Sequence, residues 1–296
     1  MKNRTRPFLA ATAILASAAL SLTGCAGNPG NATSAEDKTV SIGYVPWDEV
    51  TAATYLWEHI LEEQGYTVEV TQLEPAAVYA AVAQNDTDLF LAAIPETQGD
   101  YWDKFGDNFK SVAEWYKPLR HSLVVPDYVE ADSIKDLEGR AEEFGGRIVG
   151  IEPGSGLMKE TRTAAETYDL SGYDIVEGSS AAMLAEFERA ISKKEPIVAT
   201  AWNPHWAVGQ YKMKFLEDPE KVYVDGGIYH VIASQKAQQK EELISLLDGF
   251  SMADENLMSL LAALREAGPG NEAAAVDTWL KDDANQALVD GWISKN

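Results

Sequence analysis

The sequence has a single cysteine, few basic residues and few histidines. Cys25 alone cannot form a disulfide framework or a two-cysteine redox or zinc motif within the chain. Lys and Arg number 24 against 47 Asp and Glu, a formal net charge of −23. Because nucleic-acid binding depends on clustered basic residues, we expect no nucleic-acid partner. His59, His121, His205 and His230 have no close partner at ligand spacing, so the sequence predicts no metal site.

The chain begins with the pattern of a bacterial lipoprotein leader. Basic residues among positions 1–6 precede an apolar run over residues 9–22, which is shorter than a membrane span of ~20 residues. The run ends in LTGC (22–25), which resembles a lipobox. We expect residues 1–24 to be a signal peptide and Cys25 to carry a lipid that anchors the protein to the extracytoplasmic face of the cell membrane. The alternative is a free buried thiol. Residues 25–38 are small and polar, which is typical of a flexible tether.

Strand and helix patterns alternate after the tether. Residues 40–45 predict a strand, the apolar stripe from Ala53 to Leu61 predicts a helix, and residues 66–73 predict a second strand. This order implies parallel pairing. Because the ~270 residues left after cleavage exceed a typical single core, two lobes are expected. Further strands are expected at 88–93, 123–125, 147–151 and 196–201, and further helices at 158–168, from an N-cap at Ser180, and after Lys240.

Three of the predicted strands are followed by residues whose types are not explained by helix or strand formation alone. Open α/β sheets bind ligands at this edge. In the first group, Trp47 and Asp48 lie side by side after residues 40–45. An aromatic face attracts a cation by up to ~2 kcal/mol when desolvated, and a carboxylate adds charge complementarity. The alternative is that Asp48 caps the following helix and Trp47 packs in the core.

The second group is the glycine-rich loop from Gly150 to Gly156, which precedes a predicted helix. Free backbone N–H groups and the helix dipole favour an anion at such a place, and a carboxylate would fit. A phosphate loop is not indicated, because Leu157 and Met158 stand where Lys and Ser or Thr would be needed. The alternative is an ordinary tight turn.

The third group, residues 201–206, places Trp202 and Trp206 on either side of His205. With no second ligand nearby, His205 is interpreted as a structural hydrogen-bonding residue in preference to a zinc ligand. The sequence contains no Gly-x-Ser-x-Gly nucleophile elbow. No catalytic set and no cofactor site are therefore predicted.

Together these groups resemble one known family. The stretches GYVPWD (43–48), LVVP (123–126), GIEPGSG (150–156), SSAAM (179–183), WNPHW (202–206) and FLEDP (215–219) follow the order seen in the glycine betaine/choline-binding proteins of osmoprotectant ABC importers. The resemblance extends over residues 39–296. It implies an α/β fold of the two-lobed type II periplasmic-binding-protein class, with the ligand cleft between the lobes.

The family's aromatic cage holds a quaternary ammonium group, and backbone N–H groups of the glycine-rich loop meet the ligand's carboxylate where there is one. The resemblance implies that Trp47 and Trp202 are cage walls and that Asp48 is a charge partner. The implied ligand-binding residues are Trp47, Asp48 and Trp202, the clamp residues Gly150, Ile151 and Ser155, and the neighbouring Tyr44, His121, Pro204 and His205. Residues 39–120 with 228–296 would form lobe one and residues 121–227 lobe two, with a hinge at crossing strands near His121 and His230.

The chain departs from the family pattern after its third predicted strand. The family usually has a cage Trp in a Trp-x-Pro segment and often a His after it, whereas this chain has Ala93 and Gln98 at those positions. Losing one face of a desolvated cage would weaken trimethylammonium binding by ~1–2 kcal/mol unless another aromatic ring replaces it. The candidates for that replacement are Tyr44, Tyr79, Tyr101, Trp102 and His121.

The resemblance implies an extracytoplasmic receptor that captures glycine betaine or a related quaternary ammonium solute and delivers it to an ABC permease and ATPase. Choline, carnitine and ectoine are alternative ligands. A receptor that serves a sensor instead of a permease, and an extracytoplasmic lipoprotein enzyme on the same scaffold, are further alternatives. The resemblance implies no cofactor.

Overall fold

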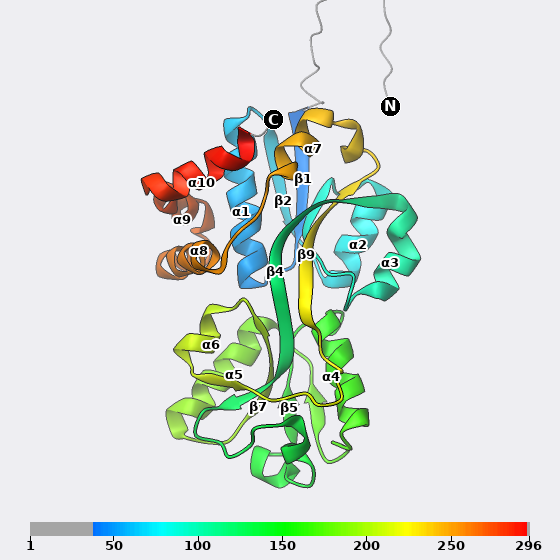
Figure 1. The fold of residues 1–296 in the computed structure, drawn as a ribbon, viewed down its shortest axis with the longest axis vertical. Coiled ribbons are helices and arrows are strands. Elements are labelled where there is room, and N and C mark those ends of the chain that lie inside the picture. The colour runs from blue at the N-terminus through cyan, green and yellow to red at the C-terminus, as the bar shows by residue number, and fades with distance from the viewer. Residues whose placement is uncertain (1–37, 295–296) are drawn as a thin grey trace, which may run out of the picture.

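The computed structural model describes residues 38–294 as two α/β lobes, one above the other in Figure 1. The predicted signal peptide and the lipidation site Cys25 lie outside these residues. Within residues 38–294 no helix combines the length and the apolar composition needed to cross a membrane. The first lobe contains β1 (Thr39–Tyr44), α1 (Asp48–Glu63), β2 (Thr67–Gln72), α2 (Pro75–Gln84), β3 (Leu89–Ala93), α3 (Gly99–Phe105), α7 (Glu241–Asp248), α8 (Asp254–Ala267), α9 (Glu272–Trp279) and α10 (Asp283–Ile293).

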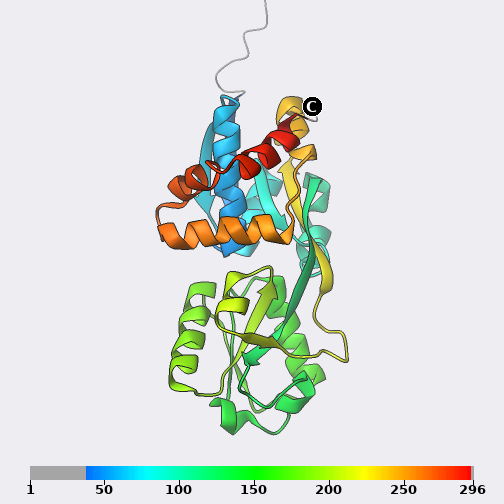
Figure 2. The ribbon, with the colours of Figure 1, turned by 60° about the vertical axis from the view of Figure 1, so that its left-hand side comes forward.

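The second lobe holds the middle of the chain. It contains β5 (Arg147–Val149), α4 (Gly156–Thr167), β6 (Asp174–Val176), α5 (Ser180–Lys193), β7 (Val198–Asn203), α6 (Trp206–Gln210) and β8 (Met213–Phe215). Two long strands, β4 (Phe109–Pro126) and β9 (Asp225–Ser234), run between the lobes, as Figures 1 and 2 both show. The chain therefore crosses from one lobe to the other twice.

The strand pairing shows how the lobes are connected. In the first lobe β1 pairs in parallel with β2 and with β3, which confirms the predicted parallel opening. In the second lobe β5 pairs in parallel with β6 and with β7. The antiparallel pair of β4 and β9 lies between these two sets, so that β9 also pairs with β3 and β4 also pairs with β7 and β8. One continuous hydrogen-bonded path joins both lobes.

Two local predictions differ from the structure. The strand expected at residues 123–125 is present, but it is only the end of β4, which begins at Phe109. Its first half carries exposed and partly buried residues such as Lys110 and Glu114, so no continuous apolar run indicates it. The N-cap of α5 is Ser179, whose hydroxyl accepts a hydrogen bond from Ala182 N, and not Ser180. Ser180 is the first residue of the helix, and its hydroxyl donates a hydrogen bond to Glu152.

The strand ends place the site residues between the lobes. Trp47 follows β1 and is the N-cap residue of α1, which has no side-chain cap. Asp48 is the first residue of that helix, so the alternative that Asp48 caps it is wrong. Trp202 lies near the end of β7, and the loop of residues 150–155 follows β5. Because the lobes face each other at these strand ends, the side chains converge from both sides.

Candidate ligand-binding site

A cavity between the lobes is lined by side chains from both. Trp47, Ile94 and Gln98 come from the first lobe, and Trp202 comes from the second. The remaining lining residues are His121 and Tyr229 on the two connecting strands and Ile151, Ser155, Gly156 and Leu157 around the start of α4. The structure thus brings together five of the residues chosen from the sequence: Trp47, His121, Ile151, Ser155 and Trp202.

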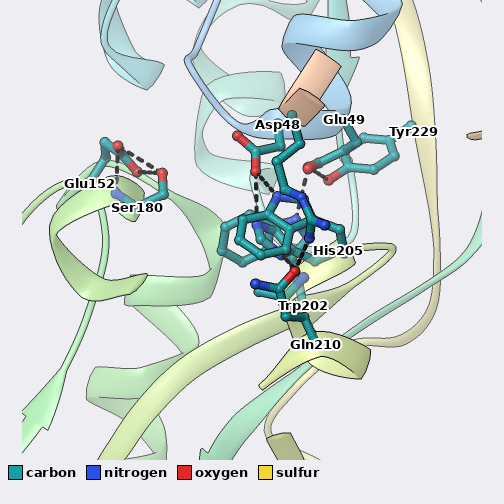
Figure 3. Close-up of polar contacts among 11 residues, drawn as sticks. Asp48, Glu49, Glu152, Ser180, Trp202, His205, Gln210 and Tyr229 are labelled. Carbon is teal, nitrogen blue, oxygen red and sulfur yellow. Dashed lines mark hydrogen bonds and ion pairs between the residues drawn. The ribbon is translucent and has the colours of Figure 1, made fainter. Parts of the chain in front are cut away.

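Trp47 forms one wall and connects the two lobes. Its indole N–H donates a hydrogen bond of 2.9 Å to Glu152 Oε2, in the loop after β5 of the second lobe. Glu152 is buried, and its other oxygen accepts hydrogen bonds of 3.1 Å from the backbone N–H and the hydroxyl of Ser180. Figure 3 shows this Glu152–Ser180 pair. The carboxylate therefore fixes the orientation of the Trp47 ring.

Trp202 and Tyr229 form the other walls and share one carboxylate. The indole N–H of Trp202 and the hydroxyl of Tyr229 both donate to Glu49 Oε1, at 2.9 and 2.7 Å (Figure 3). Glu49 is the second residue of α1 and is fully buried. Burial raises the pKa of Glu49 from its ordinary 4.5 to about 7, although the bonds from Tyr229 and Trp202 lower it. Glu49 Oε2 has no hydrogen-bond partner among residues 38–294.

We expect this burial to make the stability of the unliganded protein depend on pH. Because the pKa of Glu49 is raised by folding, its stabilising contribution is present below about pH 4.5 and is lost as the pH rises through 7. Between pH 5 and pH 8 the free energy of unfolding of wild type should therefore fall by ~2–3 kcal/mol relative to Glu49→Gln. Urea denaturation at both pH values measures this difference. An equal pH dependence in wild type and Glu49→Gln would contradict it, and Asp48→Asn is the control.

Asp48, the carboxylate chosen from the sequence, does not line the cavity. It accepts a hydrogen bond from the Trp206 indole, and its side chain is 43% exposed. His205 Nε2 lies 3.6 Å from Asp48 Oδ2, while His205 Nδ1 accepts a hydrogen bond from Ala207 N and caps α6. Burial lowers the pKa of His205 to about 4, so this imidazole is neutral near pH 7. These residues join the lobes outside the cavity.

The other residues named from the sequence lie close to the cavity without lining it. A Cβ on Gly150 would lie 2.5 Å from the Met158 sulfur, so this glycine allows the close packing of α4. Tyr44 packs edge-on against Tyr55, with ring centroids 6.1 Å apart. Pro204 lies between Trp202 and the capping His205. Within residues 38–294 no group of three or more His, Cys, Asp or Glu side chains could hold a metal ion.

Hydrogen-bond donors also line the cavity. Gln98 is 3% exposed, and its Oε1 accepts hydrogen bonds from Tyr79 OH and Ile94 N. These bonds fix the orientation of the amide, and Gln98 Nε2 has no partner in the described part of the chain. The amides at the start of a helix have no acceptor within it, and Gly156 and Leu157, the first two residues of α4, line the cavity. Together these groups can hold an anion.

His121 is fixed by a carboxylate of α4. Its Nδ1 lies 2.6 Å from Glu160 Oε2, and Glu160 Oε1 accepts from Val224 N at 2.9 Å. Of the five aromatic candidates for replacing the missing cage Trp, only His121 lines the cavity. The sequence analysis missed Tyr229, which also lines it. No signal in the sequence distinguishes Tyr229, because its strand lies far along the chain from every other part of the site.

Further contacts hold the lobes together at the edge of the cavity. Tyr101 OH donates to the carbonyl of Gly154 at 3.0 Å, and Lys159 pairs with Asp100 at 2.6 Å. On another side the Arg265 guanidinium lies 4.8 Å from the Trp206 ring centroid. Each contact joins one lobe to the other, so the structure is a closed arrangement.

Two lobes on paired crossing strands, closed around a cavity with aromatic walls, define a solute-binding protein that captures a small ligand by closing. Residues 38–282 match the family model of the substrate binding domain of ABC-type glycine betaine transport systems, and the chain belongs to this family. The predicted family is therefore confirmed. The family consists of transporter binding domains, which is the class predicted from the sequence.

Solved structures confirm the predicted two-lobed fold. Lactococcal OpuAC, in its closed-liganded conformation with glycine betaine, is 28% identical with a TM-score of 0.80 over 86% of this chain and 99% of that one. The glycine/betaine/L-proline-binding protein ProX of Borrelia burgdorferi is 28% identical with a TM-score of 0.82 over 86% and 97%. The glycine betaine/carnitine transport binding protein GbuC of Listeria monocytogenes is 30% identical over 158 residues, 52% of this chain. The match spans 51% of that relative's length.

Proposed function

We propose that this protein is the extracytoplasmic receptor of an ABC importer and that it captures a zwitterion with a quaternary ammonium group and a carboxylate, such as glycine betaine. The observation that carries the proposal is the polarity of the cavity. Trp47, Trp202 and Tyr229 line it as aromatic walls, while Gln98, which also lines it, has an Nε2 without a hydrogen-bond partner among residues 38–294. A ligand with a cation and an anion on opposite ends matches both.

We also propose that the protein delivers its ligand to a permease and ATPase and that a lipid on Cys25 anchors it to the membrane. Residues 39–120 with 228–296 would move as one lobe and residues 121–227 as the other. The hinge would lie in β4 and β9, whose mutual pairing ends at Arg120 and Asp225. The ligand would itself join the lobes, and no covalent step is proposed.

The first test is titration calorimetry on the chain beginning at Ala26, with glycine betaine, carnitine, choline and ectoine. We expect micromolar binding of glycine betaine and weaker binding of choline, whose hydroxyl offers a poorer acceptor to the donors than a carboxylate does. Binding of none of the four ligands would contradict the proposed ligand class. The same lobes would then serve a different solute.

A substitution at Gln98 tests the carboxylate end. Gln98→Glu keeps the acceptor for Tyr79 OH and Ile94 N but replaces the free donor by an oxygen. We expect affinity for glycine betaine to fall by about tenfold to a hundredfold, because a charge-assisted hydrogen bond of ~1.5–3 kcal/mol is lost, while affinity for choline falls less. Gln98→His is the control, because it can still donate. Equal losses for both ligands would show that Gln98 does not select the carboxylate.

A further inference from the structure

Glu49 is a buried carboxylate without a cationic partner. Glu49 is fully buried, and no Lys or Arg among residues 38–294 forms an ion pair with it. A buried ionised carboxylate is costly unless a positive charge or several hydrogen bonds compensate it. Glu49 Oε1 has two donors, but Oε2 has none. The unliganded protein therefore leaves the charge of this group incompletely compensated.

Glu49 contacts the cavity through two of the side chains that line it. Its two hydrogen-bond donors, Trp202 and Tyr229 (Figure 3), both line the cavity, so the carboxylate is bonded to two of the aromatic groups that would surround a cation. A cation there would supply the missing positive charge through a site of low dielectric, where charges interact strongly. Asp48, by contrast, faces Trp206 outside the cavity and is partly exposed.

We propose that Glu49 is the counter-charge of the bound cation and that it loses a proton when the ligand binds, so that capture releases a proton near neutral pH. This inference rests on the proposed function, because it needs a cationic ligand in the cavity. The proton would leave Oε2, since Oε1 is already occupied by two donors. The ligand's positive charge then stabilises the anion that burial disfavours.

The other titratable groups around Glu49 do not compete for this role. Asp48, on the same helix, raises the pKa of Glu49 by charge repulsion, after the larger effect of burial. Burial raises the pKa values of Tyr229 on β9 and Tyr116 on β4, so both phenols stay neutral near pH 7. His205, edge-on to Trp202, is also neutral, because burial lowers its pKa to about 4. Glu49 is thus the group in this cluster that changes charge near neutrality.

The direction of the pH dependence follows from these charges. A cation binds more tightly to the ionised form of Glu49, so affinity rises with pH and the pKa of Glu49 is lower in the complex than in the free protein. With a free pKa of about 7, roughly half a proton is released per ligand at pH 7, and affinity falls by up to about fivefold from pH 7 to pH 6.

Calorimetry of the protein at pH 7 in phosphate and in Tris buffer measures the released proton, because these buffers differ in ionisation enthalpy. The probes are glycine betaine and the tetramethylammonium ion, neither of which titrates near neutrality. We expect proton release with both probes in wild type and none in Glu49→Gln, whose affinity should not change between pH 6 and pH 7. Asp48→Asn should retain the release. His121→Gln should retain it too, which separates Glu49 from the imidazole that lines the cavity.

Infrared difference spectroscopy on wild type gives a readout that needs no variant: addition of tetramethylammonium should remove a protonated-carboxyl band. Binding without proton release, or release that persists in Glu49→Gln, would overturn the inference and leave the proposed function intact. Loss of the release in His121→Gln alone would overturn it as well. If neither probe binds, the proposed function fails, and the inference fails with it.

Discussion

Trp47→Ala should lower the affinity for glycine betaine by about a hundredfold to a thousandfold. The substitution removes one aromatic wall, which contributes up to ~2 kcal/mol to a desolvated cation. It also removes the indole hydrogen bond to Glu152, and a hydrogen bond to a charged group contributes ~1.5–3 kcal/mol. Because that bond connects the lobes, its loss acts on closure as well as on the ligand. Titration calorimetry measures the affinity.

Controls must separate this loss of binding from a loss of stability. Trp47 is only 4% exposed, and truncation of a buried Trp to Ala costs ~3–5 kcal/mol of stability. Trp279 is a matched control, because it is 5% exposed and donates its indole N–H to Ser259 at 2.8 Å, but it lies on α9 and does not line the cavity. Trp279→Ala should lose stability and keep its affinity. Trp47→Phe should keep the wall and lose only the hydrogen bond. Unchanged affinity in Trp47→Ala would contradict the cage assignment.

Gly156→Ala should weaken ligand binding by about a hundredfold, because the added methyl group opposes closure of the lobes. A Cβ at this position would lie 2.2 Å from the hydroxyl oxygen of Thr97, 2.5 Å from its Cβ and 3.0 Å from its carbonyl oxygen. Thr97 belongs to the first lobe and Gly156 to the second, so the added methyl group prevents the lobes from meeting. Overpacking costs ~1–3 kcal/mol, and contacts this short with backbone place the cost at the upper end.

The lobes themselves should remain folded in Gly156→Ala, because the clash exists only on closure. Small-angle scattering with saturating ligand should therefore show a more open shape than wild type. Gly209→Ala is the control within the same lobe, since a Cβ there meets no atom within 4 Å. Thr97→Gly combined with Gly156→Ala should recover part of the affinity by removing two of the three close contacts. Wild-type affinity in Gly156→Ala would show that the closed arrangement is not the binding state.

Much of the architecture follows from local patterns in the sequence. The apolar run of residues 40–45 and the apolar stripe from Ala53 to Leu61 were sufficient to predict β1 and α1, because periods of 2 and 3.6 residues are local properties. The position of Trp47 and Trp202 at strand ends was predicted for the same reason. The length and mutual pairing of β4 and β9 were not predicted from local patterns, because that pairing joins residues more than a hundred positions apart, although the resemblance implied crossing strands near His121 and His230.

Only the tertiary structure determines which polar side chains lie at the site. Asp48 and Glu49 are neighbours at the start of α1, and successive helical residues point about 100° apart, so one of them faces the interior and the other does not. Which one is buried depends on where β7 and β9 bring Trp202 and Tyr229. The sequence therefore determined the family, the fold and the aromatic residues near the cleft. The packing of the two lobes determined which carboxylate is hydrogen-bonded to these aromatic residues, because burial and hydrogen bonding arise only when distant strands meet.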